Sequence, residues 1–163
     1  MKLINDTAKK HFNWVESKGW HNKTPLESIA LIGSEIGEAM EEAFKSNGEL
    51  LSLEVADIYL RCMDLAVEHK VDLDKERQDR ADFYDKFQVN VGIILDIAYL
   101  TIPLGKLANT TRYKELPEEF SDELVKFMLI IEKVAKWNHL ELFENIDKKI
   151  NINLTKDHKK RIK

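Results

Sequence analysis

Two pairs of acidic residues stand out because each pair is spaced three residues apart within a segment of helical periodicity. The pairs are Glu35 with Glu38 and Glu54 with Asp57. Residues three apart lie on one face of an α-helix, so each pair presents two carboxylates side by side. Four carboxylates held close together raise one another's pKa unless a cation neutralises them. Oxygen ligands of this kind suit Mg²⁺ or Mn²⁺, so the four acids form a candidate metal site.

The two acidic pairs belong to longer polar stripes that run beside apolar faces. Glu42 extends the first stripe. The second stripe is formed by residues at steps of three and four: Glu54, Asp57, Arg61, Asp64 and Glu68. Nearly all other positions of that second helix are apolar, which predicts burial on almost every side. Its stripe is then either a thin exposed seam or an enclosed polar site. From periodicity alone, two ordinary solvated stripes are the more common arrangement.

The elements that must position these acids are all predicted to be helices, because no segment alternates apolar and polar residues at period two. The expected helices cover residues 5–17, 25–45, 50–69, 72–86, 117–137 and 140–150, and the fourth could continue into the apolar segment 87–107. Expected N-caps are Asn5 or Asp6, Thr24, Ser52, and Asp72 or Asp74. Thr24 is followed by Pro25 and by Glu27, which is a typical helix start.

The sequence therefore predicts a single all-α domain, residues 1–163, built as a helical bundle with a four-helix core. The two acidic helices are separated by the short break 46–48 and should pack antiparallel, with their stripes facing. We assign the acidic, potentially catalytic half to residues 1–86, a helical second half to 87–154, and a basic tail to 155–163. The tail is either a solvated extension or an arm that contacts phosphate.

A degenerate internal repeat of a helix pair is an open alternative for the origin of the bundle. Residues 52–73 align with 121–142, so that Glu54 falls on Glu123 and Asp57 faces Lys126. In the same alignment Glu38 faces Lys106. Amphipathic helices match at this level by chance as well. If the duplication is genuine, only the first copy retains the acids.

Composition narrows the classes of function. The net charge of −4 argues against general affinity for a nucleic acid backbone, which would need a basic face. No uncharged stretch reaches membrane-spanning length, so no membrane partner is expected. Cys62 is the single cysteine and stands in an apolar helical run, where it should be a buried small hydrophobe. With no signal peptide in the first residues, we expect a cytoplasmic protein.

The five histidines are not expected to bind metal. None of them follows a glutamate by three residues, as a helical di-iron carboxylate site would require. Their spacings do not form a zinc-binding pair either. Each histidine is therefore predicted to be a surface or capping residue.

The acidic pattern and its flanks match a known signature. Glu35-x-x-Glu38 is separated by fifteen residues from Glu54-x-x-Asp57. Around them, residues 11–14 read HFNW, 16–20 read ESKGW, 30–42 read ALIGSEIGEAMEE and 56–65 read ADIYLRCMDL. These segments resemble the MazG-like all-α nucleoside triphosphate pyrophosphohydrolases over roughly residues 8–74.

The resemblance implies that the chain cleaves a nucleoside triphosphate between the α- and β-phosphates, with Mg²⁺ held by the four acids. We assign the general base to Glu38. Arg61 lies one turn from both Asp57 and Asp64, so we expect it to orient them by ion pairing, with direct phosphate contact as the alternative.

Other substrate contacts are carried over from the resemblance or taken from residue type. Lys75 and Arg80 are candidate phosphate contacts, although the asparagine found with them in relatives is missing here. Trp14 and Trp20 could stack on the base, or could simply pack the first helix. Small relatives dimerise, which implies a homodimer here, or a monomer if the repeat is genuine.

The leading hypothesis is an enzyme that converts (d)NTP and water to (d)NMP and pyrophosphate and so clears surplus or non-canonical nucleotides. Hydrolysis of another nucleotide is a variant of the same class. The alternative from a different class is a non-catalytic helical interaction protein that retains the fold. The acid-poor second half and the imperfect basic segment favour that alternative, whereas the presence of all four acids argues against it.

Overall fold

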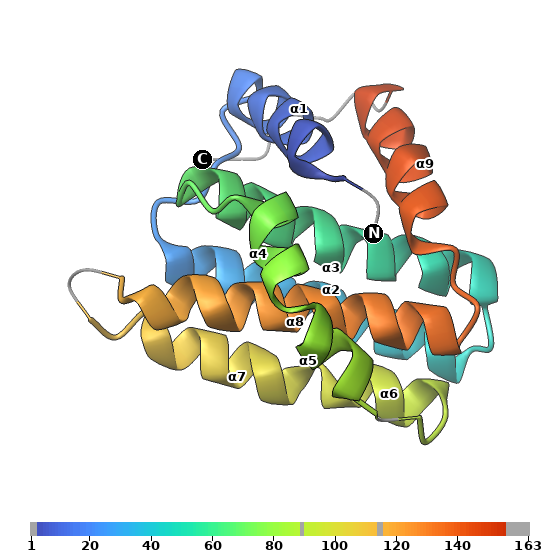
Figure 1. Ribbon diagram of the computed structural model, residues 1–163. Coiled ribbons are helices and arrows are strands. Elements are labelled where there is room, and N and C mark those ends of the chain that lie inside the picture. Colours follow the sequence, from blue (N-terminus) through green and yellow to red (C-terminus); the bar gives the residue numbers. More distant parts are fainter. Residues whose placement is uncertain (1–2, 89, 114–115, 156–163) are drawn as a thin grey trace.

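Helices are the only regular secondary structure in the residues that the computed structural model describes, which are 3–88, 90–113 and 116–155 (Figure 1). Nine helices are formed there: α1 (Asn5–Ser17), α2 (Pro25–Phe44), α3 (Gly48–Glu68), α4 (Leu73–Asp79), α5 (Ala81–Lys86), α6 (Ile93–Tyr99), α7 (Thr101–Thr110), α8 (Glu118–Trp137) and α9 (Leu142–Thr155). The predicted all-α class is confirmed. Within this described part, no helix is both long and apolar enough to cross a membrane.

A four-helix core is completed within one chain. The α2–α3 pair packs against α7 and α8, with α6 extending the α7 side (Figure 1). This is the arrangement expected if one helix pair repeats the other, although the duplication itself stays a prediction. Because one chain supplies all four core helices, the fold does not require a second copy. The homodimer likewise stays a prediction.

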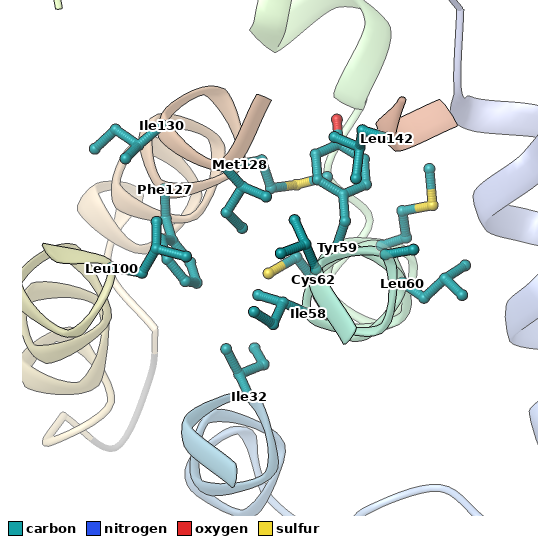
Figure 2. Close-up of a cluster of buried hydrophobic side chains, with 14 of the residues drawn as sticks. Ile32, Ile58, Tyr59, Leu60, Cys62, Leu100, Phe127, Met128, Ile130 and Leu142 are labelled. Carbon is teal, nitrogen blue, oxygen red and sulfur yellow. The ribbon is translucent and has the colours of Figure 1, made fainter. Parts of the chain in front are cut away.

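The centre of the molecule is α3, which contacts α1, α2, α8 and α9. Ile58, Tyr59 and Cys62 on this helix are fully buried. Figure 2 shows Ile58 of α3 facing Ile32 of α2, with side chains of α8 on the other side of the same cluster. The predictions that this helix is buried on nearly all sides and that Cys62 lies in the core are confirmed. Burial of each large aliphatic side chain contributes roughly 1.5–3 kcal/mol, so α3 anchors the bundle.

The end of α1 is shaped by Gly19, which has a φ of +67°. In this left-handed conformation the Trp20 amide donates to the Val15 carbonyl at 3.3 Å, and the Gly19 amide donates to the Glu16 carbonyl at 2.9 Å. These two bonds define a Schellman motif, in which glycine is favoured because it lacks a Cβ. The motif turns the chain back and sets Trp20 beside the last turns of α1.

The predicted helix boundaries hold for α1 and α2, but two predicted caps are wrong. Thr24 caps α2 as expected, accepting from the Glu27 amide at 3.2 Å. Asn5 instead accepts from the Leu73 amide at 3.0 Å, because the N-terminus of α1 packs against the start of α4. For α3 the cap is Asn47, since the helix begins two residues earlier than expected and the Ser52 hydroxyl donates to the Gly48 carbonyl.

The segment predicted as one helix from 72 to 86 is divided into α4 and α5 at Arg80. Among the described residues that follow, 87, 88 and 90–92 are not helical. Asp72 caps α4, accepting from the Lys75 amide at 3.2 Å. Further on, α6 and α7 are separated at Leu100. Pro103 has no amide hydrogen to donate to the Tyr99 carbonyl four residues back, which explains the interruption there.

A buried polar network, which sequence reasoning missed, joins three helices. The Tyr59 hydroxyl donates to Glu132 Oε1 at 2.5 Å, and Arg77 Nε donates to the same oxygen at 2.8 Å. Arg77 is only 1% exposed. Burial raises the pKa of the Glu132 carboxyl, and the charge of Arg77 offsets part of that rise. The network fixes α3, α4 and α8 relative to one another.

We predict that Glu132→Gln lowers the free energy of unfolding by roughly 3 kcal/mol, because it removes the negative charge that faces the buried Arg77 guanidinium. Urea unfolding followed by circular dichroism measures this. Glu16→Gln on exposed α1 surface is the matched control, and it should change the free energy by less than about 0.5 kcal/mol. A Glu132→Gln protein as stable as this control would contradict the assigned role.

Candidate functional site

A pocket of about 660 Å³ is lined by residues of α1, α2, α3 and α9 and of the loop after α1. Helices α1 and α9 both pack on α3 (Figure 1). Cavities of this size are typical of small-molecule sites. Its wall includes every member of the polar stripe of α3: Glu54, Asp57, Arg61, Asp64 and Glu68. The stripe therefore lines an open pocket, in which Glu68 is exposed and the other four side chains are partly buried.

Three of the four predicted acids converge at one end of this pocket. Glu35 and Glu38 of α2 and Glu54 of α3 each offer a carboxylate oxygen, and these oxygens all lie within 4.8 Å of one another. Glu35 is buried, Glu54 is partly buried and Glu38 is exposed. The facing stripes predicted from the sequence thus meet at these residues. A set of carboxylate oxygens at this spacing can hold a metal ion that prefers hard oxygen ligands, such as Mg²⁺ or Mn²⁺.

The fourth acid, Asp57, lies beside this cluster but pairs with a lysine. Lys149 Nζ is 2.5 Å from Asp57 Oδ2 and 4.0 Å from Glu54 Oε1. Lys149 belongs to α9, in the second half of the chain, which the sequence does not link to the acidic site. The division at residue 86 is therefore not a boundary of the site. Sequence reasoning missed Lys149 because only the packing of α9 on α3 brings it there.

Electrostatics at this end are dominated by burial. Burial raises the pKa of the Asp57 carboxyl, and the hydrogen bond and charge of Lys149 offset only part of that rise. Burial also raises the pKa of the Glu54 carboxyl, again against the charge of Lys149. Burial lowers the pKa of Lys149, but the hydrogen bond and charge of Asp57 outweigh it, so the pKa is raised overall. Lys149 is consequently a permanent positive charge at neutral pH.

Arg61 has a different partner from the one predicted. Its Nε donates to Glu35 Oε1 at 2.7 Å, and its Nη2 lies 2.6 Å from the same oxygen. The prediction of ion pairs with Asp57 and Asp64 is wrong, because α2 packs directly across from Arg61. The four acids then face two cations, Arg61 and Lys149. The cluster has two negative charges in excess when fully ionised, which a divalent cation would balance.

The opposite end of the pocket is aromatic. Trp14 of α1 and Trp20 of the following loop are in edge-to-face contact, with ring centroids 5.5 Å apart, and both line the pocket. His11 lies one turn before Trp14 and is only 6% exposed, so the expectation of a surface or capping role is wrong for this residue. Its Nδ1 is 2.8 Å from Asp64 Oδ1. Its spacing of three from Trp14 was the signal that both face the same side.

Lys75 and Arg80, the predicted phosphate contacts, are not among the residues that line the pocket. Lys75 is exposed, and its Nζ lies 3.1 Å from Asp79 Oδ2 one turn further along α4. Arg80 Nε donates to Asp122 Oδ1 of α8 at 2.8 Å. The structure gives both residues partners outside the site, because α4 packs on α8 and not on α2. The basic stretch 156–163 lies outside the described residues.

Comparison of the chain with protein-family models, with curated proteins and with solved structures gave no match. The protein is therefore classified by its own fold and site alone. The protein is an all-α bundle with a pocket that has, at one end, an acidic cluster that could bind a metal ion and, at the other end, aromatic rings.

We predict that the protein binds Mg²⁺ or Mn²⁺, and that Glu38→Gln weakens this binding by about tenfold or more, because one of three converging carboxylates is lost. Isothermal titration calorimetry with each metal measures it. Glu41→Gln is the matched control on the same helix, since Glu41 is exposed and pairs with Lys45. Equal metal affinity in the two variants would rule out the cluster as the binding site.

Proposed function

We propose that this protein is a Mg²⁺-dependent nucleoside triphosphate pyrophosphohydrolase that converts (d)NTP and water to (d)NMP and pyrophosphate. One observation carries the proposal: three carboxylates converge beside a lysine at one end of a pocket whose other end is aromatic. Such a site can accept a phosphate chain with its counter-ion and, in line with it, a base. The resemblance of residues 8–74 to the MazG-like signature supports the same reaction.

The length of the pocket agrees with a substrate that extends from an ionic end to an aromatic one. Glu54 and Asp64 are ten positions apart on α3, which corresponds to about 15 Å along the helix axis. Glu54 belongs to the acidic cluster, whereas Asp64 contacts His11 next to Trp14. A triphosphate at the first position leaves room for the sugar and the base toward the second.

Glu35, Glu38 and Glu54 would hold the metal ion. When bound, a divalent cation would offset the negative charge of the phosphates and help to orient them. Arg61 keeps the Glu35 carboxylate in position through its paired contacts at 2.7 and 2.6 Å. Burial of Glu35 also restricts its rotamers, which helps to keep its carboxylate oriented toward the site.

Glu38 is the proposed general base. It is exposed to the pocket, and no ion pair found among the described residues includes it. Because the metal would take one oxygen of its carboxylate, the other oxygen is available to take a proton. The water oxygen attacks the α-phosphorus, and its proton passes to Glu38. The bond from that phosphorus to the oxygen bridging to the β-phosphate breaks, and pyrophosphate leaves.

Lys149 is the proposed phosphate contact, in place of Lys75 and Arg80. Its ammonium group is a compact charge on a flexible stem, so it can turn from Asp57 toward a phosphate oxygen. Asn153, one turn further along α9, also lines the pocket and can donate a hydrogen bond from its amide. Both residues come from the second half of the chain.

We expect pyrophosphate release from at least one member of a (d)NTP panel in the presence of Mg²⁺. At Mg²⁺ concentrations that saturate the variant, Glu38→Gln should still lower kcat by about 10²–10⁴-fold, because the amide cannot take the water's proton. A coupled pyrophosphate assay measures this, with circular dichroism to verify the fold and Glu41→Gln as control. If no nucleotide is hydrolysed and no Mg²⁺ binds, the chain is better described as a non-catalytic helical interaction protein.

Lys149→Met should have two opposite effects. It should lower kcat/KM by about tenfold, corresponding to about 1.4 kcal/mol, because a phosphate contact is lost while the aliphatic stem is kept. It should also tighten Mg²⁺ binding, because the charge of Asp57 is no longer neutralised by its neighbour at 2.5 Å. Lys148→Met is the control, since Lys148 is exposed and pairs with Glu144. Weaker Mg²⁺ binding in Lys149→Met would contradict this assignment.

A further inference from the structure

The aromatic end of the pocket carries a second pair of charged and polar side chains, formed by His11 and Asp64. A carboxylate can only accept hydrogen bonds, so His11 Nδ1 carries the proton and donates to Asp64 Oδ1 at 2.8 Å. His11 is buried, whereas Asp64 keeps 20% of its side-chain surface exposed and lines the pocket. The contact fixes the carboxylate of Asp64 against the pocket wall.

The second oxygen of Asp64, Oδ2, takes part in no hydrogen bond or ion pair among the described residues. It is also not among the buried polar atoms that lack a partner, so it is accessible. Because His11 occupies the other oxygen, Oδ2 is the acceptor that Asp64 offers to a ligand. It is held in place before any ligand arrives.

The groups around Asp64 make this end rich in acceptors. Glu68 lies one turn further along α3 and lines the same pocket with a second carboxylate. The nearest guanidinium, that of Arg61, is engaged by Glu35. The amide of Asn22 already donates to the Ser28 hydroxyl at 3.1 Å. The carboxylates of Asp64 and Glu68 therefore offer acceptors to a ligand group that enters here and supplies a hydrogen-bond donor.

We propose that Asp64, positioned by His11, reads an amino group on the nucleobase, so that the pocket selects amino-bearing bases over uracil and thymine. Cytosine, adenine and guanine each present an exocyclic amino donor, whereas thymine presents a carbonyl oxygen at the corresponding edge. The one ring N–H of uracil or thymine that could donate is flanked by two carbonyl oxygens, which a carboxylate repels. Trp14 and Trp20 supply the apolar surface on which the base stacks.

This inference rests on the proposed function for the identity of the ligand, and it names the substrate class of the same site. A site built to bond a particular polar group strongly rejects an analogue that lacks it, because the acceptor is then covered by the ligand and left unpaired. Asp64 would act on substrate choice alone. It lies about 15 Å along α3 from Glu54, so its replacement should leave metal binding unchanged.

The test compares substrates that differ only by an amino or an oxo group. We expect kcat/KM to be at least about tenfold higher for dCTP than for dUTP and for dATP than for dITP. Asp64→Asn, whose amide can also donate, should bring each ratio close to one. His11→Gln should lower the ratios to a lesser degree, whereas Asp82→Asn, at an exposed position, should not. Mg²⁺ affinity, measured by calorimetry, should be unchanged in all three variants.

A second measurement is independent of turnover. Binding of dCMP and dUMP, followed by tryptophan fluorescence, should show the same preference and the same loss in Asp64→Asn. Absence of hydrolysis together with an Asp64-dependent preference for dCMP would overturn the proposed reaction but support the base site. Equal affinities for dCMP and dUMP, unchanged by Asp64→Asn, would overturn the base site even if the enzyme is active.

Discussion

A charged stripe on the most deeply buried helix is the constraint on which the rest of the structure depends. Helix α3 contacts four other helices, yet it carries acids and an arginine at successive turns. Charges that are taken from water must be paired or must coordinate a cation. Three separate elements supply partners: Glu35 of α2 binds Arg61, Lys149 of α9 binds Asp57, and His11 of α1 binds Asp64. These contacts hold the walls of the pocket in place.

The charged side chains of the stripe are balanced by opposite charges to different degrees along α3. The two ends of the pocket therefore differ in chemistry. At one end, carboxylates of α2 and α3 outnumber the cations near them, which gives the site its capacity for a metal ion. At the other end, a single carboxylate is fixed by a histidine beside two tryptophan rings. The network around Glu132 lies on the far side of α3, toward α8 and away from the pocket wall. Its hydrogen bonds join α3 to α4 and α8.

The local sequence predicted where most helices begin. It failed where a predicted cap residue bonds to another helix. Thr24 caps α2 as its sequence predicts, because its partner is three residues away. Asn5 does not cap its own helix, since its amide oxygen bonds to the backbone of α4 instead. Arg80 shows the same limitation for the site. The resemblance to the MazG-like family implied a phosphate contact at this residue, but α4 packs on α8 and the charge of Arg80 faces Asp122.

By itself, the sequence determined the all-α class, the buried third helix and the two acidic pairs, because each of these depends on periodicity and spacing within one helix. Tertiary structure decided which charges meet. Lys149 lies 92 positions from Asp57 in the chain and Asp64 lies 53 from His11, and no local pattern encodes such distances. Only the packing of α1 and α9 on the same side of α3 brings these residues to the stripe. The physical reason is that periodicity fixes the face of a helix, whereas its neighbour is chosen by the packing of the whole chain.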